Sequence, residues 1–514
     1  MKQQSVLILP LLASLAGCVV GPNYKGPPDV APASEAAGHF HRSPAAPVEP
    51  VPPAARWWLA LNDAELTRLI ELAMSASPTL DVAEARIREA RAALGQQRAR
   101  LLPQGSATGL ALKTRIPTGQ LPSLADQINP VLAALPATGS TAPATIDVPK
   151  HYTLDLYNAG FDASWAIDLF GETRRGIEQA RARAQAAIIS YQDSQVQLAS
   201  EVGQAYVNLR DAQHRLDLSR RSAVLERRML GLTLARRRLG TADDSDVERL
   251  QTQINQTDAG LPSLASQVDE AMDQLARLAG REPGTFDAEL AVVVPLPLPP
   301  ANVPVGDPAG MLRRRPDVRM AERQLVASNA SIGQAVAQMF PQVTLFGTIG
   351  FSSTSVSDLF KGSSLSAIGG PSLSWNILSF GRIQSQIRQA RASNDESIAQ
   401  YRSTVLSALQ DAERSLSRFG GQRATVVELA RADQSAARSA QIVAVRYRGG
   451  TASFLDALDA ERQRLQAEQS LAQAQAQLTN DYVSLQMSLG LGWQDPPATP
   501  WPSMTPPDKA APLR

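Results

Sequence analysis

Apolar residues recur at alternating steps of three and four along two long stretches of the chain, which is the spacing of a helical packing seam. The first stretch carries this seam at Ile177, Ala180, Ala184, Ala187, Tyr191, Gln195, Leu198, Val202, Ala205, Leu209, Ala212 and Leu216. No proline occurs in the 68 residues 172–239, which predicts a helix of roughly 100 Å. The second stretch, 382–448, is similar. Glycine turns follow both stretches and predict returning helices at about 244–279 and 453–490.

Four shorter stretches alternate between apolar and polar residues, which is the period of a β-strand. They cover about 104–113, 159–169, 342–351 and 370–379. The clearest of them places its apolar face at Phe161, Ala163, Trp165 and Ile167. Such strands form an antiparallel sheet whose apolar face packs against either a protein core or lipid. Helices far too long for a compact domain flank each strand pair, and together with the export signal described below they favour lipid.

The chain is a tandem repeat. A shift of 210 positions superposes Phe170 on Phe380, Trp165 on Trp375, Gly240-Thr241 on Gly450-Thr451, Asp246 on Asp456 and Gly280 on Gly490. Upstream the shift is 238, as from Pro78 to Pro316. The first copy therefore has 28 additional residues, which lie between Gln104 and Phe170. We divide the chain into a first repeat at 56–294, a proline-rich linker at 295–308 and a second repeat at 309–493.

Both ends of the chain lie outside the repeats. Residues 1–17 read as a secretory signal, with Lys2 followed by an apolar run and small residues before Cys18, the single cysteine. This arrangement resembles a bacterial lipoprotein signal, in which the cysteine thiol receives a lipid; the alternative is an ordinary signal peptide with a chance cysteine. Residues 18–55 are predicted to form an extended proline-rich strap, and 494–514 a flexible proline-rich tail.

Composition excludes several functions. The chain has 50 Lys and Arg against 49 Asp and Glu, so it lacks the basic excess that nucleic acid requires. One Cys and four scattered His exclude a Cys/His zinc site. No Walker loop, G-x-S-x-G or H-E-x-x-H motif occurs, so we predict no enzyme, no bound cofactor and no source of energy within the chain.

Four strands are too few to close a barrel, for which about eight is the minimum. An open sheet edge is not tolerated in lipid. A sheet in the membrane must therefore be shared between two, three or four copies of the chain.

An ordered set of motifs resembles the TolC-like outer-membrane efflux family, in its lipoprotein (NodT/OprM-type) branch that serves resistance-nodulation-division pumps. The motifs are Cys18, Gly21-Pro22-Asn23-Tyr24, Phe340-Pro341-Gln342, Ser374-Trp375, Phe380-Gly381, Tyr447-Arg448 and Leu455-Asp456-Ala457-Leu458-Asp459-Ala460. The resemblance implies a mostly α fold with a small β part. It also implies a homotrimer with a twelve-stranded transmembrane β-barrel, four strands per chain, above a periplasmic helical tunnel. The implied partners are a periplasmic adaptor, an inner-membrane pump and outer-membrane lipid.

The resemblance also implies roles for single residues at the periplasmic end of the second helix pair. Leu455 matches a gate leucine, Asp456 and Asp459 match a ring of carboxylates, and Arg462 and Tyr447 match a bonded network that holds the returning helix inward. Three copies of two carboxylates around a narrow axis would favour cations. The local alternative is that Asp456 caps its helix and Asp459 complements the helix dipole.

The turns at this end are expected to receive the adaptor through Gly240, Thr241, Asp246, Gly450 and Thr451. The arginines before each turn fit such a surface, or simply a solvated helix C-terminus. The 28 additional residues of the first repeat fall in the loop 113–157, which the resemblance places outside the cell.

Three functional classes remain. The first is an outer-membrane exit duct for small molecules such as drugs and organic toxicants, driven by a partner pump. The second is a duct of the same shape for type I protein secretion. The third is a lipid-anchored periplasmic coiled-coil scaffold. The lipid signal favours the first over the second, and the paired alternating strands disfavour the third.

Overall fold

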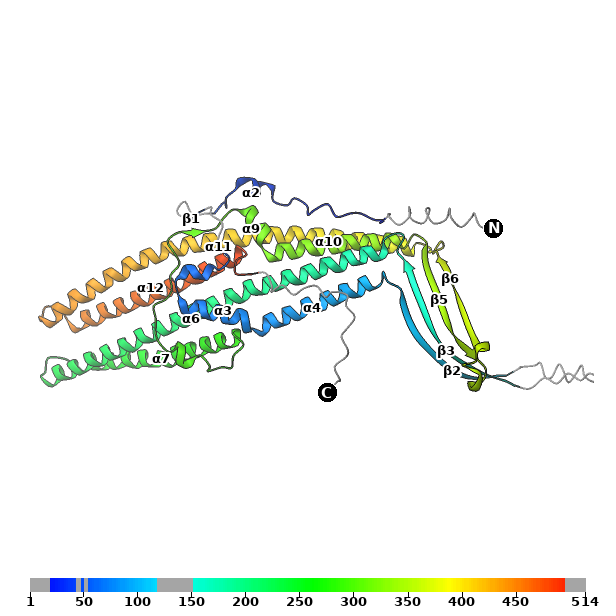
Figure 1. Ribbon diagram of the computed structural model, residues 1–514. Coiled ribbons are helices and arrows are strands. Elements are labelled where there is room, and N and C mark those ends of the chain that lie inside the picture. Colours follow the sequence, from blue (N-terminus) through cyan, green and yellow to red (C-terminus); the bar gives the residue numbers. More distant parts are fainter. Residues whose placement is uncertain (1–18, 43–47, 50–53, 118–150, 495–514) are drawn as a thin grey trace, which may run out of the picture. The chain divides into compact units, whose positions relative to one another are not determined.

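The computed structural model describes residues 19–42, 48–49, 54–117 and 151–494 (Figure 1). The signal 1–17, Cys18, residues 118–150 of the inserted loop and the tail 495–514 lie outside the described residues. The chain forms two compact units, which are described separately. The first contains residues up to Asn23 with Leu94–Glu178 and Ala330–Arg391, and the second contains Tyr24–Ala93, Gln179–Asn329 and the chain from Ala392 onward.

The first unit is built on a four-stranded antiparallel sheet. The strands are β2 (Gln104–Pro117), β3 (His151–Ile167), β5 (Gln342–Ser353) and β6 (Leu365–Ser374), in the spatial order β2-β3-β5-β6. Two short 3-10 turns, Val356–Asp358 and Gly362–Ser364, connect β5 to β6. Among the described residues β2 and β6 are therefore the edges of the sheet, each with one side unpaired.

The register gives this sheet one apolar face and one mainly polar face. Phe161 lies opposite Ile349, and Trp165 lies opposite Leu345, so their side chains share a face. Phe161 is 68% exposed and Ile349 is 53% exposed in the single chain. On the other face Thr108 Oγ1 donates a hydrogen bond of 2.8 Å to the Asp162 carboxylate. The alternation read from the sequence is thus confirmed, and its apolar side has no cover within this unit.

Three of the four strands have boundaries that differ clearly from the prediction. The fourth strand was placed at 370–379, but it spans Leu365–Ser374, because its ladder with β5 ends at the pair Gln342–Ser374. Pro341 precedes that pair and has no N–H group to extend the ladder. Trp375, expected on the strand, instead donates its indole N–H to Met339 O at 3.1 Å. The second strand begins at His151 rather than 159, because β2 also runs on to Pro117 and pairs with it.

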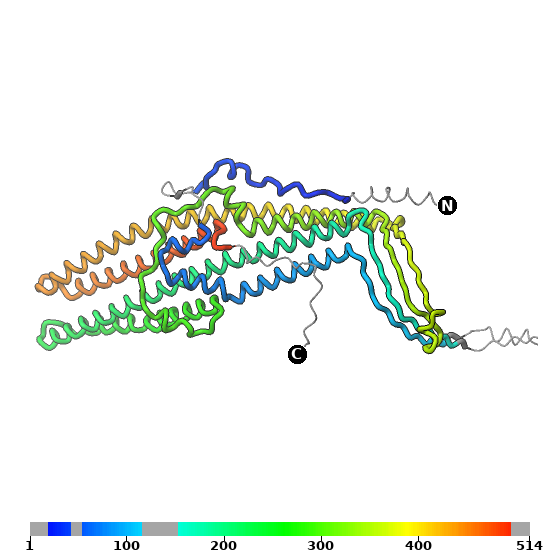
Figure 2. Tube along the Cα trace, viewed as in Figure 1, coloured from blue at the N-terminus to red at the C-terminus, as the bar shows by residue number. Residues whose placement is uncertain are grey.

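Six helices of 22 residues or more account for over half of the described residues (Figures 1 and 2). They are α4 (Pro78–Ala99), α6 (Glu172–Arg238), α7 (Asp244–Leu278), α10 (Pro316–Ala337), α11 (Arg382–Arg448) and α12 (Phe454–Ser488). The four longest begin and end within two residues of the predicted bounds. None of the helices in the described ranges combines the length and the apolar character that crossing a membrane requires.

The long helices pair as two hairpins in the second unit, α6 with α7 and α11 with α12 (Figure 2). Arg227 on α6 donates to both carboxylate oxygens of Asp258 on α7 at 2.7 Å. Gln422 on α11 donates to Ala474 O on α12 at 2.9 Å. Pro262 lies inside α7 without ending it. The two hairpins are joined in turn by a hydrogen bond of 3.0 Å between Asn480 and Asn208.

An aromatic core fixes the middle of the second unit. Trp57, in a short 3-10 helix (Trp57–Leu61), is 3% exposed and packs edge-on against Trp58 and Tyr482. The helix α3 (Ala64–Ala76) follows and is capped by Asp63, which also accepts a hydrogen bond of 2.8 Å from the Tyr206 hydroxyl. One carboxylate thus ties α3 to α6.

The strap and the linker contain more regular structure than the sequence predicted. The strap includes the short helix α2 (Pro32–Ala37) and the strand β1 (Val48–Glu49). The linker contains β4 (Val303–Pro304), which pairs with β1 in parallel, and its last residue begins α9 (Pro308–Arg314). A further short helix, α8 (Asp287–Leu290), precedes the linker at the end of the first repeat. Proline composition hid these elements, although proline is well suited to the first turn of a helix, as in α2 and α9.

Candidate functional site

The two hairpins end in turns with the same geometry. Gly240 and Gly450 adopt left-handed φ angles of 71° and 77°. The next residue in each case, Thr241 or Thr451, donates its backbone N–H to the carbonyl of an arginine at 2.9 Å. Each threonine hydroxyl donates to the same carbonyl, at 3.0 Å and 3.2 Å respectively. The turns satisfy the last carbonyls of α6 and α11 in the manner of a Schellman motif. We call residues 239–246 and 449–456 the tip.

The returning helices are capped by different side chains in the two repeats. Asp243 caps α7 by accepting the backbone N–H of Ser245. In α12 Ser453 and Asp456 form a capping box, in which Asp456 accepts from the Ser453 backbone N–H at 2.9 Å and from its hydroxyl at 2.8 Å. These hydrogen bonds lower the pKa of the Asp456 carboxyl group. Asp456 is therefore a capping residue in the isolated chain, and it is an exposed anion as well.

A contact at the tip that the sequence did not predict joins the two hairpins. The Arg236 guanidinium, at the end of α6, lies 4.9 Å from the centre of the Tyr447 ring, at the end of α11. Tyr447 also packs near the Phe454 ring, with the ring centres 6.2 Å apart. Tyr447 was expected to act with Arg462, but among the described residues its partners are Arg236 and Phe454. The run of three arginines at 236–238 predicted a charged surface, but it did not indicate which arginine would contact an aromatic ring.

A groove of about 710 Å³ runs beside the first turns of α7 and α12. It is lined by Ser245, Glu248, Arg249, Thr252, Gln253, Gln256, Leu455, Leu458, Asp459 and Arg462. Leu455 is 45% exposed, and Asp459 accepts a hydrogen bond of 2.8 Å from Gln463. The predicted residues Leu455, Asp459 and Arg462 therefore share one surface, and Asp456 lies beside it. Asp246 is in the first turn of α7.

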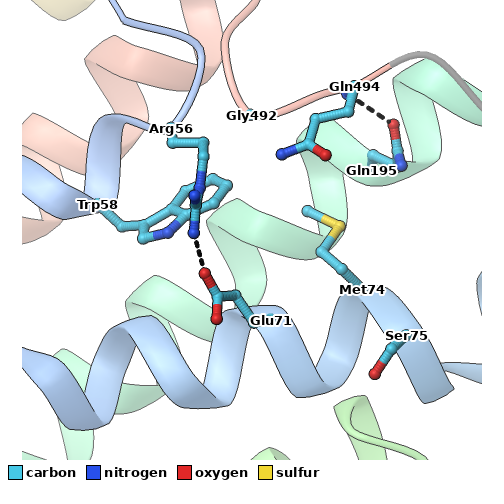
Figure 3. A pocket seen from close by; sticks show the side chains of 8 residues that line it. All are labelled: Arg56, Trp58, Glu71, Met74, Ser75, Gln195, Gly492 and Gln494. Carbon is cyan, nitrogen blue, oxygen red and sulfur yellow. Dashed lines mark hydrogen bonds and ion pairs between the residues drawn. The ribbon is translucent and has the colours of Figure 1, made fainter.

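A second cavity, of about 400 Å³, lies between the second half of α3, the residues Arg56 and Trp58 that precede this helix, α6 and the last described residues (Figure 3). Arg56 and Glu71 form an ion pair on one side of it. Met74 and Gln494 point into the space beside this pair. The Gln494 backbone N–H donates to the Gln195 amide oxygen at 3.0 Å. These contacts attach the end of the second repeat to the aromatic core.

The described residues hold no group of three or more His, Cys, Asp or Glu side chains suited to a metal ion. The tip offers exposed carboxylates and leucines instead, and arginines lie just before each of its turns. Such an arrangement can bind a protein surface or select ions by charge.

The chain belongs to the outer membrane efflux protein family, whose model matches residues 69–281 and 309–491. It is thus an outer-membrane transport protein and not an enzyme. The matched segments fall in the two repeats, and the predicted family is confirmed.

Similar proteins with known names or structures span nearly the whole chain. Nodulation protein T of Rhizobium leguminosarum bv. trifolii is 29% identical over 93% of this chain and 95% of its own length. The solvent efflux pump outer membrane protein SrpC of Pseudomonas putida is 27% identical over 96% of this chain and 99% of its own. The solved outer-membrane channel OprN has a TM-score of 0.80 at 31% identity, covering 93% of this chain and all of that one. The TolC-like fold class, mostly helical with a small sheet, is confirmed.

Proposed function

We propose that the protein is the exit duct of a tripartite efflux system, through which small molecules cross the outer membrane passively. An inner-membrane resistance-nodulation-division pump would supply the energy, and a periplasmic adaptor would connect the pump to the tip. Relatives named as solvent, toluene and antibiotic efflux components support organic compounds as the cargo. In this proposal the pump, and not the duct, selects the cargo.

The sheet with two unpaired edges and an uncovered apolar face is the observation that carries this proposal. Its edge strands β2 and β6 can pair only with another copy of the chain, and in lipid they must do so. Three copies would supply twelve strands in a closed barrel, which is wide enough to leave a channel. The helices α6 and α11, each of 67 residues and roughly 100 Å, have the length that a tunnel through the periplasm needs.

The tip would form the narrow periplasmic end of the duct. In a trimer, Leu455, Asp456 and Asp459 would each occur three times around the axis, and their carboxylates would hold cations there. The turn residues Gly240, Thr241, Asp246, Gly450 and Thr451 would meet the adaptor. Arg462 and Tyr447 would hold α12 against its neighbours in the closed state.

The N-terminus would provide a second attachment to the membrane, through a lipid on the Cys18 thiol. A single acyl chain gives only marginal membrane binding, so the barrel and the lipid would act together.

Single-channel conductance in a planar bilayer tests the duct and its gate. The informative variant is Asp456→Gln/Asp459→Asn, because glutamine at the third helical position preserves the capping box while removing the charge. We expect wild type to give a small, cation-selective conductance. In the double variant the conductance should rise severalfold and the cation selectivity should fall, because six negative charges leave the constriction of a trimer.

Asp246→Asn, which removes the carboxylate at the equivalent position of the first repeat, is the matched control and should leave conductance unchanged. A double variant identical to wild type would keep the duct but place the gate elsewhere. Absence of conductance from membrane-bound wild-type protein would exclude the duct and favour a lipid-anchored scaffold. Conductance that requires a secreted polypeptide substrate would favour the protein-secretion alternative.

A further inference from the structure

The motif Gly21-Pro22-Asn23-Tyr24 has no part in the duct or the gate, yet the structure gives its first residues specific partners in the first unit. The central partner is Arg175, near the start of α6, which is 4% exposed. Its Nε donates to Val20 O at 3.2 Å, and its Nη2 donates to Gly21 O at 3.3 Å and to Asn23 Oδ1 at 2.6 Å. Its Nη1 donates to Glu178 at 2.7 Å. Most of the hydrogen-bond donors of this buried guanidinium thus bind one short peptide.

The peptide backbone approaches the unit too closely for side chains. Val20 donates its N–H to Phe170 O at 3.1 Å. A Cβ on Gly21 would lie 2.5 Å from the Cα of Gly333 on α10, and a Cβ on Gly333 would lie 2.8 Å from the Arg175 side chain. A Cβ on Gly171, between β3 and α6, would lie 2.8 Å from Val19. Only glycine permits these contacts, because every other residue carries a Cβ.

The second repeat provides an internal comparison. Ser385 stands where the first repeat has Arg175, so the same position there carries no guanidinium. Gly381 is equivalent to Gly171, and Gly95 is equivalent to Gly333. A Cβ at either of these would have no neighbour within 4 Å in the described chain. Arg175 and Gly171 belong to the first repeat and Gly333 belongs to the second, so the peptide contacts both repeats, and the equivalent positions Ser385, Gly381 and Gly95 have neither the arginine nor the close packing in the described chain.

We propose that Arg175, Gly171 and Gly333 form a binding site for the chain's own N-terminal peptide, residues 19–23, and that Arg175 is its positioning residue. The ligand is a peptide backbone that bends at its third position, Gly21, where φ is 89°, and that carries a side-chain amide at its fifth. We call these three residues the docking site.

Docking holds Val20 beside the end of the sheet, because Val20 donates its N–H to Phe170, three residues beyond the end of β3. A lipid on the Cys18 thiol, which rests on the proposed function, would be attached only two residues before this anchored position. The docking itself does not depend on the lipid.

Cleavage by trypsin after Lys25 measures release of the peptide. Lys25 is exposed in the structure, so cleavage there depends on how often the segment around it detaches. We would follow the new N-terminus at Gly26 by mass spectrometry on the full-length protein in detergent. Gly21→Ala should accelerate cleavage at least about tenfold over wild type, because loss of the close fit also removes hydrogen bonds to a charged group. Gly26→Ala is the matched control, since Gly26 also has a positive φ, of 111°, but no neighbour within 4 Å.

Three further variants test the other side of the contact. Arg175→Ala should accelerate cleavage as Gly21→Ala does, and Arg175→Lys nearly as much, because one ammonium cannot serve all the acceptors of the guanidinium. Gly333→Ala should also accelerate cleavage, whereas Gly95→Ala, at the equivalent helical position, should not. Gly21 lies in the exposed peptide, so its variant tests docking even if Arg175→Ala fails to fold.

Equal cleavage of Gly21→Ala, Gly26→Ala and wild type would overturn the proposal. So would acceleration by Gly95→Ala equal to that by Gly333→Ala, because the effect would then come from helix packing in general. Palmitate labelling and conductance of the same wild-type preparation separate this result from the proposed function. Suppose that the wild-type protein carries no palmitate or gives no conductance, while wild type is still cleaved slowly and Gly21→Ala is cleaved fast. That result would exclude the lipid or the duct and would still support the docking site.

Discussion

Replacing Trp57 by alanine is expected to destabilise the second unit by about 3–5 kcal/mol, which is the usual cost of removing a buried tryptophan side chain. Trp57 is 3% exposed and lies between Trp58 and Tyr482, with ring centres at 5.7 Å and 6.1 Å. Gly203 on α6 leaves room for it, because a Cβ there would be 2.9 Å from the indole ring. The cavity cannot close easily, since rigid helices form its walls.

Thermal denaturation followed by circular dichroism measures this effect. A loss of this size should lower the midpoint by roughly 10 °C in a unit of this size. Leu59→Ala is the control, because Leu59 lies on the same 3-10 helix and is 48% exposed. A shift of Trp57→Ala no larger than that of Leu59→Ala would contradict the assignment of Trp57 to the core.

Gly280→Ala is expected to be almost as damaging, for a different reason. Gly280 ends α7 with a φ of 66°, and a Cβ there would lie 2.3 Å from Ala76 O and 3.1 Å from Pro78. The left-handed conformation costs an alanine about 1–2 kcal/mol. Forcing atoms apart in a packed core adds about 1–3 kcal/mol. Because the close atom belongs to the backbone, rotation of a side chain cannot relieve the clash.

Gly240→Ala separates the two costs. Gly240 has a φ of 71° and no neighbour within 4 Å, so only the conformational penalty applies there. Thermal denaturation should therefore give a lower midpoint for Gly280→Ala than for Gly240→Ala. The midpoint of Gly240→Ala should in turn lie slightly below that of wild type. Equal midpoints for the two variants would show that the end of α7 can move away from α3 without loss. Gly490→Ala should behave like Gly280→Ala, since its Cβ would lie 2.9 Å from the Arg315 Cα.

The long helices could be predicted closely because their signals are local. The apolar period defines the length of α6, and Gly240 marks its end through a backbone conformation that few other residues adopt. The strands were harder, because their limits depend on partners distant in sequence. β6 ends at Ser374 because its partner β5 begins after Pro341, and nothing within 370–379 reveals that limit. The apolar residues Trp375 and Ile377 continue the alternating pattern past the true end of the strand.

The tip could be predicted as a location but only partly as a set of contacts. The motif at 453–456 encodes a capping box, and this local alternative for Asp456 is what the single chain shows. The contact of Arg236 with Tyr447 joins residues from different repeats, so sequence spacing could not identify it. Arg175 was missed for the same reason, because its ligands Val20 and Asn23 lie more than 150 positions away.

Because one side of β2 and one side of β6 are unpaired among the described residues, the rate at which the sheet is completed would depend on the concentration of chains. In the proposed shared barrel, the last backbone hydrogen bonds of each chain would form only when another chain arrives, so the final step would be bimolecular or higher. Its rate depends on how many chains share the same patch of membrane. A newly exported chain would then wait with its helices formed and its sheet edges open. A strain that makes fewer copies would lose finished ducts out of proportion to the loss of protein.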